Sequence, residues 1–537
     1  MVEINLGVLV VIISLGVLFY RWLTRNNGYF HDKPIPSMAV TPLFGSTGPL
    51  ILRQYSFGGF INYIYNKYPN AKVFGMMDAT MPIFVVRDPE LIKKVTVKDF
   101  DHFGDHRPMF GNDKNDNPYS LFGKTLFSME GQKWRDMRAT LSPAFTGSKM
   151  RHMFQFIIEC SSSVAKYYYS RADGSQSVEL TDLFTRFGSD VIATCAFGLK
   201  VDSLEDPDNE FYRTGRKMMR FDRLSVALRM FGFKFIPTLM GKWGIDVVDR
   251  PQARYFRTLI LEAIKERQSK GIVRPDMIHL LLQARKGALR QEKEKEHDEG
   301  FATVQESDIG KANVSMSMTE NEMIAQAFVF FLAGFETVST TLSYLMHDLV
   351  INPDVQQMLY EEIVATEGSL DGKTLDYDTL QKMRYMDMVV SESMRKSPAA
   401  AMLDRLCIRD YDLDDGEGLK FKIDKGTAVW IPVYGIHMDP KYYPDPEEFD
   451  PERFSVDNRA SVNPFTYMPF GVGPRNCIGN RFALMEIKTV IYHLLLHFSF
   501  ERNDKTQVPL RMRKGYTIPA PESGVHVEFR KRSGVSK

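Results

Sequence analysis

The chain has 537 residues, enough for a large core and for more than one domain on length alone. Its apolar content of 44% and charged content of 25% are those of an ordinary globular protein, and its net charge of +1 gives no electrostatic reason to expect a nucleic-acid partner. The four cysteines lie far apart without a CxxC pair, so neither a disulfide framework nor a zinc site is predicted.

The first segment of the chain reads as a membrane anchor. Residues 4–23 are almost wholly apolar, and roughly 20 helical residues cross a hydrocarbon core of about 30 Å. A cleaved signal peptide is the alternative, but no basic residue precedes the run and no small-residue cleavage site follows it. Arg21 and Arg25 place the following chain in the cytosol by the positive-inside rule. We expect a retained transmembrane anchor over 1–25, with a shorter monotopic insertion still open.

A proline-rich segment, 26–50, follows the anchor. It contains four prolines, including Pro34 and Pro36, which fix the chain in an extended form. We predict a stiff hinge here, and a catalytic domain over 51–537.

The start of that domain mixes helices with short strands. Residues 73–76 and 82–86 read as a strand pair, and Asp88 with the following Pro-Glu predicts a helix start. The stretch 101–125 is rich in glycine and proline and reads as a long loop, a kind of segment that often carries function.

Trp134 and Arg138 lie four residues apart and share one face of a predicted helix. An indole donor and a guanidinium fork suit a ligand that bears carboxylates. A surface helix with a half-buried tryptophan explains the pair equally well when it stands alone.

Two later segments are less specific. Residues 207–245 mix aromatic and basic side chains, and 231–237 fits either a membrane-facing surface or a helix end turned to the core. The segment 283–318 opens with a run, 283–300, that is dense in charges of both signs and has no apolar periodicity, so we predict a solvated, mobile connection without chemistry.

Thr319 and Glu322 form a capping box that opens a long helix to about residue 350. In its middle, Gly334 costs about 1 kcal/mol against alanine, which has a use if something approaches the backbone. Ala333 and Thr337 share a face beside it, so a hydroxyl there could hold water or a diatomic ligand. The neighbouring carboxylate, Glu336, could exchange protons. An ordinary buried helix is the alternative.

Glu392 and Arg395 stand three apart on a helix, which alone indicates a common salt bridge of small value. Arg453 lies in a proline-bounded coil 24 residues before Cys477. If the three side chains meet, they form a partly buried network in which loss of one member leaves an uncompensated charge.

The most specific pattern is the loop 470–479, in which glycines surround Cys477 directly ahead of a periodic apolar helix. The positive end of a helix dipole favours a thiolate, the form of cysteine that binds iron. We therefore interpret Cys477 as the axial ligand of a haem.

In chain order, the motifs WxxxR, AGxET, ExxR, PERF and FGxGPRxCxG resemble those of the cytochrome P450 family over nearly the full chain. The sequence around these motifs is similar to that of microsomal insect enzymes that metabolise xenobiotics. The resemblance implies the cytochrome P450 fold, mainly α with small β-sheets, behind an N-terminal membrane anchor helix. One departure lies at 396–400, where a single proline follows ExxR and the family usually has two. That segment lines the substrate cavity in the family, so substrate identity does not follow from the resemblance.

The resemblance also implies roles for individual residues. Cys477 would bind the iron of haem b (iron protoporphyrin IX), with Phe470 packed beside the sulfur and Gly479 leaving room for the macrocycle. Thr337 and Glu336 would deliver protons to dioxygen in a groove opened by Ala333 and Gly334. The donors to the haem propionates would be Trp134, Arg138, Arg405 and Arg475, and the structural triad behind the haem would be Glu392, Arg395 and Arg453.

The implied reaction inserts one atom of O2 into a lipophilic substrate, such as a plant compound or insecticide. NADPH–cytochrome P450 reductase would supply the electrons, with cytochrome b5 as a further candidate donor, because the chain shows no nucleotide-binding GxGxxG motif. The catalytic domain would lie on the cytosolic face of the endoplasmic reticulum membrane. Two alternatives are a haem-thiolate isomerase or dehydratase that does not use O2, and a non-catalytic membrane-anchored haem sensor.

Substrate contacts are expected from aromatic and apolar segments, although core packing is the alternative for each. The candidates are the loop 110–127, Phe328, Phe331, the segment 399–403 and residues 516–518.

Overall fold

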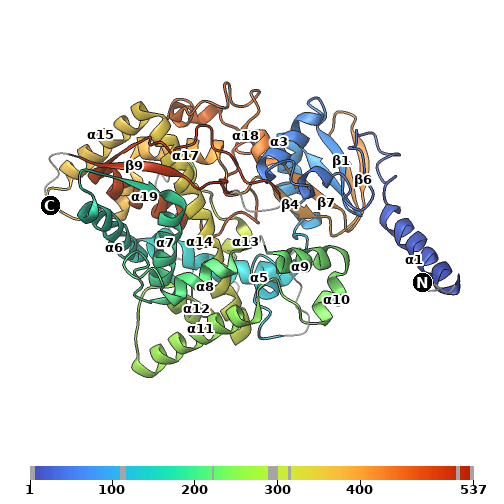
Figure 1. The fold of residues 1–537 in the computed structure, drawn as a ribbon, viewed down its shortest axis with the longest axis horizontal. Coiled ribbons are helices and arrows are strands. Elements are labelled where there is room, and N and C mark those ends of the chain that lie inside the picture. Colours follow the sequence, from blue (N-terminus) through green and yellow to red (C-terminus); the bar gives the residue numbers. More distant parts are fainter. Residues whose placement is uncertain are drawn as a thin grey trace, which may run out of the picture. The chain divides into compact units, whose positions relative to one another are not determined.

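The structure is a computed structural model that describes residues 6–108, 117–220, 223–287, 289, 300–312, 316–515 and 520–532. It confirms a mainly helical chain with small sheets (Figure 1). The chain divides into two compact units. The smaller unit comprises Met1–Arg107, Ala400–Asp439 and Arg513–Pro519, and the larger comprises Pro108–Ala399, Pro440–Met512 and Ala520–Lys537. The partition into anchor, hinge and catalytic domain stays a prediction.

The smaller unit is built on a four-stranded sheet of order β1-β2-β7-β4. The predicted strand pair is confirmed as antiparallel β1 and β2, whereas β7 runs parallel to β2 and antiparallel to β4. Buried side chains of Phe60, Phe74, Ile83 and Trp430 form its core. The strands are β1 (Val73–Asp78), β2 (Met81–Val86), β4 (Leu403–Leu406) and β7 (Ala428–Ile431), with the hairpin β5 (Tyr411–Asp414) and β6 (Lys420–Ile423).

Short helices complete this unit. The predicted helix start at Asp88 is confirmed, since its carboxylate accepts a hydrogen bond from Leu91 N–H at 3.0 Å. The helices are α1 (Leu6–Thr24), α2 (Gly48–Ile51), α3 (Phe57–Lys67), α4 (Pro89–Lys93) and α18 (Val433–His437).

Helix α1 coincides with the predicted anchor. Its side chains from Val8 to Tyr20 are exposed, and the window Gly7–Thr24 is long and apolar enough to cross a membrane. The buried core helix Glu320–Ile351 passes the same length and composition test, so exposure distinguishes the two. The apolar exposed surface of α1 supports a membrane anchor.

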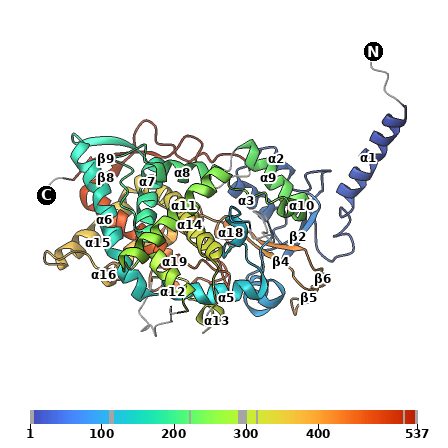
Figure 2. The same ribbon diagram turned by 90° about the horizontal axis from the view of Figure 1, so that it is seen from below.

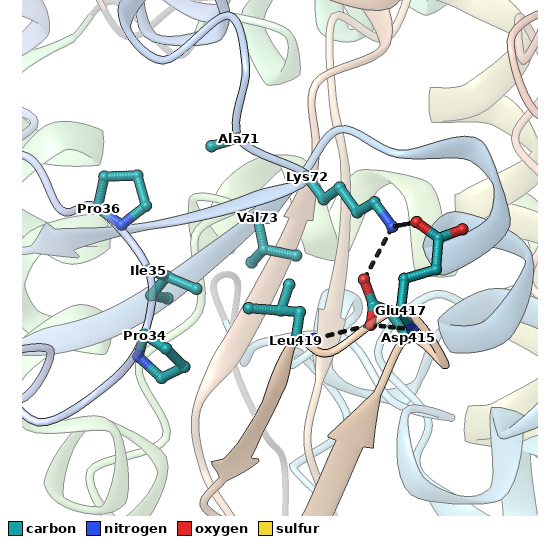
Figure 3. A pocket seen from close by; sticks show the side chains of 9 residues that line it. All are labelled: Pro34, Ile35, Pro36, Ala71, Lys72, Val73, Asp415, Glu417 and Leu419. Atoms are coloured by element: carbon teal, nitrogen blue, oxygen red, sulfur yellow. Dashed lines mark hydrogen bonds and ion pairs between the residues drawn. The ribbon is translucent and has the colours of Figure 1, made fainter.

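The proline-rich segment packs along the sheet of the smaller unit. Met38 N–H donates to Gly75 O at 2.9 Å, and Gly75 N–H donates to Pro36 O at 2.8 Å. Pro34 and Pro36 also line a shallow pocket in which Lys72 Nζ reaches two carboxylates of the β5–β6 hairpin (Figure 3). The segment is thus fixed by backbone pairing as well as by its prolines.

The larger unit carries most of the helices. They are α5 (Gly131–Leu141), α6 (Gly147–Arg171), α7 (Leu180–Ile192), α8 (Glu210–Met218), α9 (Leu224–Phe235), α10 (Pro237–Lys242), α11 (Arg250–Lys270), α12 (Met277–Arg285), α13 (Asp308–Lys311), α14 (Glu320–Ile351), α15 (Pro353–Ser369), α16 (Tyr377–Gln381), α17 (Arg384–Lys396) and α19 (Asn480–His497). Its sheet has the order β3-β9-β8, from β3 (Ser175–Glu179), β9 (His526–Lys531) and β8 (Phe498–Glu501).

Helix α14 is the axis of this unit, in contact with α7, α11, α12, α17 and α19 (Figures 1 and 2). The predicted capping box is confirmed, because Glu322 N–H donates to Thr319 Oγ1 at 3.2 Å and Thr319 N–H donates back to the Glu322 carboxylate at 2.9 Å. Two carboxylates in the first turn also stabilise the helix, because they lie at the positive end of its dipole.

Within 231–237, some side chains are exposed, as a membrane-facing surface requires, and others are buried, as a helix end turned to the core requires. Phe231 is 50% exposed in α9, whereas Phe233 is buried against Met240 of α10. Ile236, Leu239 and Trp243 are also exposed. One face of the α9–α10 pair is therefore apolar and open, as a membrane-facing surface requires.

The prediction of a solvated connection over 283–318 is wrong for part of its length. Residues 288, 290–299 and 313–315 lie outside the described chain. Residues 300–307 instead pack closely: Ala302 is 2% exposed, and Phe301 N–H donates to Asp387 of α17 at 2.6 Å. The charge density of 283–300 predicted solvation for the whole connection, but the partners of 300–307 lie far away in sequence and could not be seen in it.

Candidate functional site

The loop that carries Cys477 has the backbone that its glycines predict. Gly471 and Gly473 have φ of 74° and 71°, in the left-handed region that disfavours side chains. Cys477 N–H donates to Phe470 O at 2.8 Å, so the loop closes on itself, and α19 starts three residues beyond the sulfur. This geometry places a single thiol just before a helix N-terminus.

The Cys477 side chain is exposed, yet desolvation by the surrounding protein raises the pKa of its thiol. The Gly479 N–H and Arg138 lower this pKa, while Glu306 raises it further. These neighbours act on the free thiol, whereas a coordinated metal ion deprotonates a coordinating thiol.

Gly479 and Phe470 flank the thiol. A Cβ added at Gly479 would meet only Phe145 at 3.7 Å, an ordinary contact, and its φ of −96° suits any residue. Neither the backbone nor the neighbouring protein atoms demand a glycine here. The open side of Gly479 is consistent with space for a flat prosthetic group, and Phe470 is half-buried beside the loop.

One face of α14 opens in an otherwise buried stretch. Ala333 and Thr337 are exposed, whereas Phe331, Phe335 and Val338 are buried. The Thr337 hydroxyl donates to Ala333 O at 2.6 Å, which leaves its oxygen able to accept a further hydrogen bond. This exposed pair matches the predicted small-residue face.

Glu336 and Gly334 lie in different environments: Glu336 is desolvated with Arg216 nearby, and Gly334 packs against α7. Desolvation raises the pKa of Glu336 and the charge of Arg216 opposes it, so the carboxyl retains its proton to a higher pH than usual. A Cβ on Gly334 would overlap Ile192 Cδ1 of α7. Close helix packing therefore accounts for Gly334 without an oxygen groove.

The predicted propionate donors of the larger unit gather near the Cys477 loop. Trp134 and Arg138 are buried on α5, and the Arg475 guanidinium lies 3.9 Å from the Trp134 ring centroid. Arg475 donates to Met129 O at 2.8 Å, and Arg138 donates to Asn476 O at 2.8 Å. These side chains thus frame the residue that precedes Cys477.

Arg405 belongs to the smaller unit, on β4, so the structure does not place it relative to Cys477. It is 1% exposed and donates to Asp404 O at 2.7 Å. Burial lowers the pKa of Arg405 to about 10, and Asp404 only partly opposes this. The expected bond of Arg405 to a haem propionate stays a prediction.

Glu392, Arg395 and Arg453 meet in the larger unit. Arg395 Nε and Nη2 donate to the Glu392 carboxylate at 2.7 and 2.8 Å, and both side chains are fully buried. Arg453 Nε lies 3.5 Å from Glu392 Oε1. The two guanidinium groups thus share one carboxylate, and Arg395 binds it in the bidentate geometry that makes Arg–carboxylate pairs strong.

The candidate substrate contacts are resolved only in part. Phe328 and Phe331 are fully buried and pack on Phe256, so core packing explains both. Phe127 is 39% exposed. Residues 109–116 and 516–518 lie outside the described chain.

Sequence reasoning missed Glu306 and Asn476. Glu306 Oε2 accepts from Arg138 Nη2 at 2.7 Å, and Asn476 Oδ1 accepts from the same nitrogen at 2.6 Å. Asn476 stands inside the recognised loop and could have been found there. Glu306 had no local signal, since it lies 168 residues from Arg138.

These features test whether the residues fit a haem. Within the part of the chain that the structure describes, no three His, Cys, Asp or Glu side chains gather as a metal site. Buried arginines, an open Gly479 and an exposed small-residue face suit a haem. The class of site is that of a haem-thiolate protein.

The comparisons with known proteins agree. The family model described as Cytochrome P450 matches residues 36–529. Cytochrome P450 9e2 of Blattella germanica is 42% identical over 94% of each chain. Probable cytochrome P450 9f2 of Drosophila melanogaster is 41% identical over 96% of this chain and 98% of that protein, and cytochrome P450 3A9 of Rattus norvegicus is 34% identical over 94% and 93%.

The chain therefore belongs to the cytochrome P450 family, and it is a haem-thiolate monooxygenase. Membership implies a haem iron, O2, a lipophilic substrate and a redox partner.

Proposed function

We propose that this protein oxygenates lipophilic xenobiotics, such as plant compounds or insecticides, at a haem b whose iron is bound by Cys477. The observation that best supports this site is the exposed thiol of Cys477 in a loop whose glycines adopt positive φ. When bound, the haem supplies the redox chemistry of O2 activation. The substrate class rests on the resemblance to insect enzymes.

The chain's own residues hold the group and move protons. Cys477 gives its sulfur to the iron, while the amide of Gly479 donates a hydrogen bond toward it. Arg405 and Arg475 would pair with the haem carboxylates, together with Trp134 and Arg138. Such charge-assisted bonds orient the macrocycle as well as bind it.

Proton delivery falls to α14. Burial raises the pKa of Glu336, so its carboxyl holds a proton to a higher pH than an exposed one, and Thr337 is the adjacent hydroxyl on the exposed face. A proton leaving Glu336 through Thr337 or a water reaches that face. Ala333 keeps the face low enough for a diatomic ligand to approach the backbone.

We further propose that the protein resides in the endoplasmic reticulum membrane with its catalytic domain in the cytosol. Exposed apolar side chains of α1, followed by Arg21 and Arg25, support this orientation. The exposed apolar face of α9 and α10 supports a second membrane contact. NADPH–cytochrome P450 reductase, with cytochrome b5 as an additional donor, shares that membrane surface.

The test is reconstitution of the full chain with NADPH–cytochrome P450 reductase in lipid vesicles, followed by a product screen against lipophilic plant compounds and insecticides. We expect NADPH-dependent products that carry one added oxygen. Turnover of hydroperoxides without NADPH consumption would refute the proposal. Cys477→Ala is the matched control: it should lose the red-shifted Soret band of the ferrous–CO complex, and a retained band would refute thiolate ligation.

A further inference from the structure

Residues 300–307, which we call the strap, are anchored at their start on α17. A Cβ on Gly300 would overlap Asp387 Oδ1, so a glycine is required for this approach. Phe301 N–H donates to Asp387 Oδ2 at 2.6 Å, and Lys488 Nζ of α19 pairs with Asp387 Oδ1 at 2.9 Å. The first residues of the strap thus dock on a carboxylate that a buried lysine already orients.

Aromatic packing and backbone pairing continue this attachment. The ring centroid of Phe301 lies 4.9 Å from that of Phe454 and 5.2 Å from that of Tyr467. Val304 N–H donates to Asn480 Oδ1 at 3.3 Å, and Asn480 Nδ2 donates back to Val304 O at 3.3 Å. The strap therefore pairs with the first residue of α19, directly after the Cys477 loop.

The end of the strap meets the Cys477 loop itself. Asn476 Nδ2 donates to Gln305 O at 3.2 Å. The Glu306 carboxylate accepts from Arg138 Nε at 3.3 Å, from Arg138 Nη2 at 2.7 Å and from Ser142 Oγ at 3.0 Å. Arg138 in turn donates to Asn476 O and Oδ1 at 2.8 and 2.6 Å.

This network is a closed one: strap, α5 and loop each contact the other two. The Arg138 side chain is 4% exposed and that of Glu306 is 20% exposed, so solvent screens the pair only weakly. The second N–H of Arg138 Nη1 takes no part in these bonds, so the same guanidinium can still serve a haem carboxylate.

We propose that Glu306 is a positioning residue for the thiolate ligand: it fixes Arg138 against Asn476, and so sets the position and charge environment of Cys477. The inference rests on the proposed role of Cys477 as the iron ligand. The strap would thus help to position the iron ligand, a function that the charge-dense run before it does not indicate.

Removing the Glu306 carboxylate removes a negative charge near the iron and leaves Arg138 unneutralised. This change of one unit charge favours the added electron of the reduced haem. Glu306→Gln should therefore raise the one-electron midpoint potential by a threefold to tenfold change in the redox equilibrium constant, about 30–60 mV. Glu306→Asp, which keeps the charge, should stay near the wild-type potential.

Gly300→Ala tests the strap without changing a charge. Its Cβ would displace the strap from Asp387, so it should shift the potential in the same direction as Glu306→Gln. Glu501→Gln is the matched control, because it removes a carboxylate from the pair with Arg530 on the β8–β9 sheet and should leave the potential unchanged.

The measurement is a spectroelectrochemical titration of the haem-loaded full chain. Wild-type protein without the thiolate ferrous–CO band would refute the proposed iron ligand, not the strap. With that band present, an unchanged potential in both Glu306→Gln and Gly300→Ala overturns the inference. A shift in Glu306→Gln without one in Gly300→Ala overturns the strap's part in it. If Glu306→Gln does not fold, Gly300→Ala takes its place. A raised potential in Gly300→Ala, with a wild-type potential in Glu306→Asp, supports the inference, and an unchanged potential in Gly300→Ala overturns it.

Discussion

Helices α7 and α14 pack closely where each carries a glycine. A Cβ on Gly334 would overlap Ile192 Cδ1 and lie 3.0 Å from Cγ1, and a Cβ on Gly188 would lie 3.3 Å from Phe335 O. Gly334→Ala gains about 1 kcal/mol of helix propensity. Overpacking against Ile192 costs about 1–3 kcal/mol, so we expect a net loss of about 0–2 kcal/mol in the free energy of unfolding.

A double-mutant cycle separates packing from an oxygen groove. Ile192→Val removes the overlapping Cδ1 and alone costs about 0.5–1.5 kcal/mol. In the double variant the overlap is relieved, so we expect a favourable interaction energy of about 1–2 kcal/mol between the two changes. Gly368→Ala on α15 is the matched control, since an added Cβ there meets nothing within 4 Å and should bring the propensity gain alone.

The assay is urea unfolding of the haem-loaded variants, with the fraction of NADPH that appears as product measured in parallel. An interaction energy near zero would refute the packing explanation of Gly334. If stability returns in the double variant while the product fraction stays low, Gly334 has the oxygen-groove role that the sequence predicted.

Further predictions concern charge and protons. Burial raises the pKa of Asp190 from 3.8 to about 7, against hydrogen bonds from Ser203. A raised folded pKa makes stability fall as pH rises from about 4 to 7, by up to about 4 kcal/mol, so Asp190→Asn should remove this fall in denaturation midpoints; an identical pH profile would contradict it. Thr337→Ala should keep the haem but divert electrons from product to peroxide, and unchanged coupling of NADPH to product would count against its role. Glu392→Gln leaves Arg395 buried without a full counter-charge, so haem-loaded protein should lose about 3–5 kcal/mol of stability; a wild-type unfolding midpoint would show the network is dispensable.

Local patterns predicted the fold elements well. The strand pair of β1 and β2, the Asp88 cap and the capping box of α14 depend on residues within a few positions of one another. Their determinants are hydrogen bonds that the sequence spacing already specifies. The register of β7 beside β2 was not predicted, because it joins residues more than 340 positions apart.

The candidate site divides in the same way. The Cys477 loop was predictable because glycine, proline and cysteine spacing constrain the backbone directly. The strap was not, because it follows a charge-dense run that predicts solvation, while its own attachment comes from distant partners such as Asp387 and Asn480. Composition measures the average cost of burial, whereas a few well-placed hydrogen bonds decide whether a particular segment is bound.

Ala333 and Gly334 show why neighbours on a helix need separate explanations. Successive residues point about 100° apart, so Ala333 shares the exposed face with Thr337 while Gly334 faces α7. The contact at Gly334 fixes how closely α14 lies against α7, and the helix transmits that position rigidly to Thr337 one turn later. The position of the exposed face therefore depends on the packing behind it.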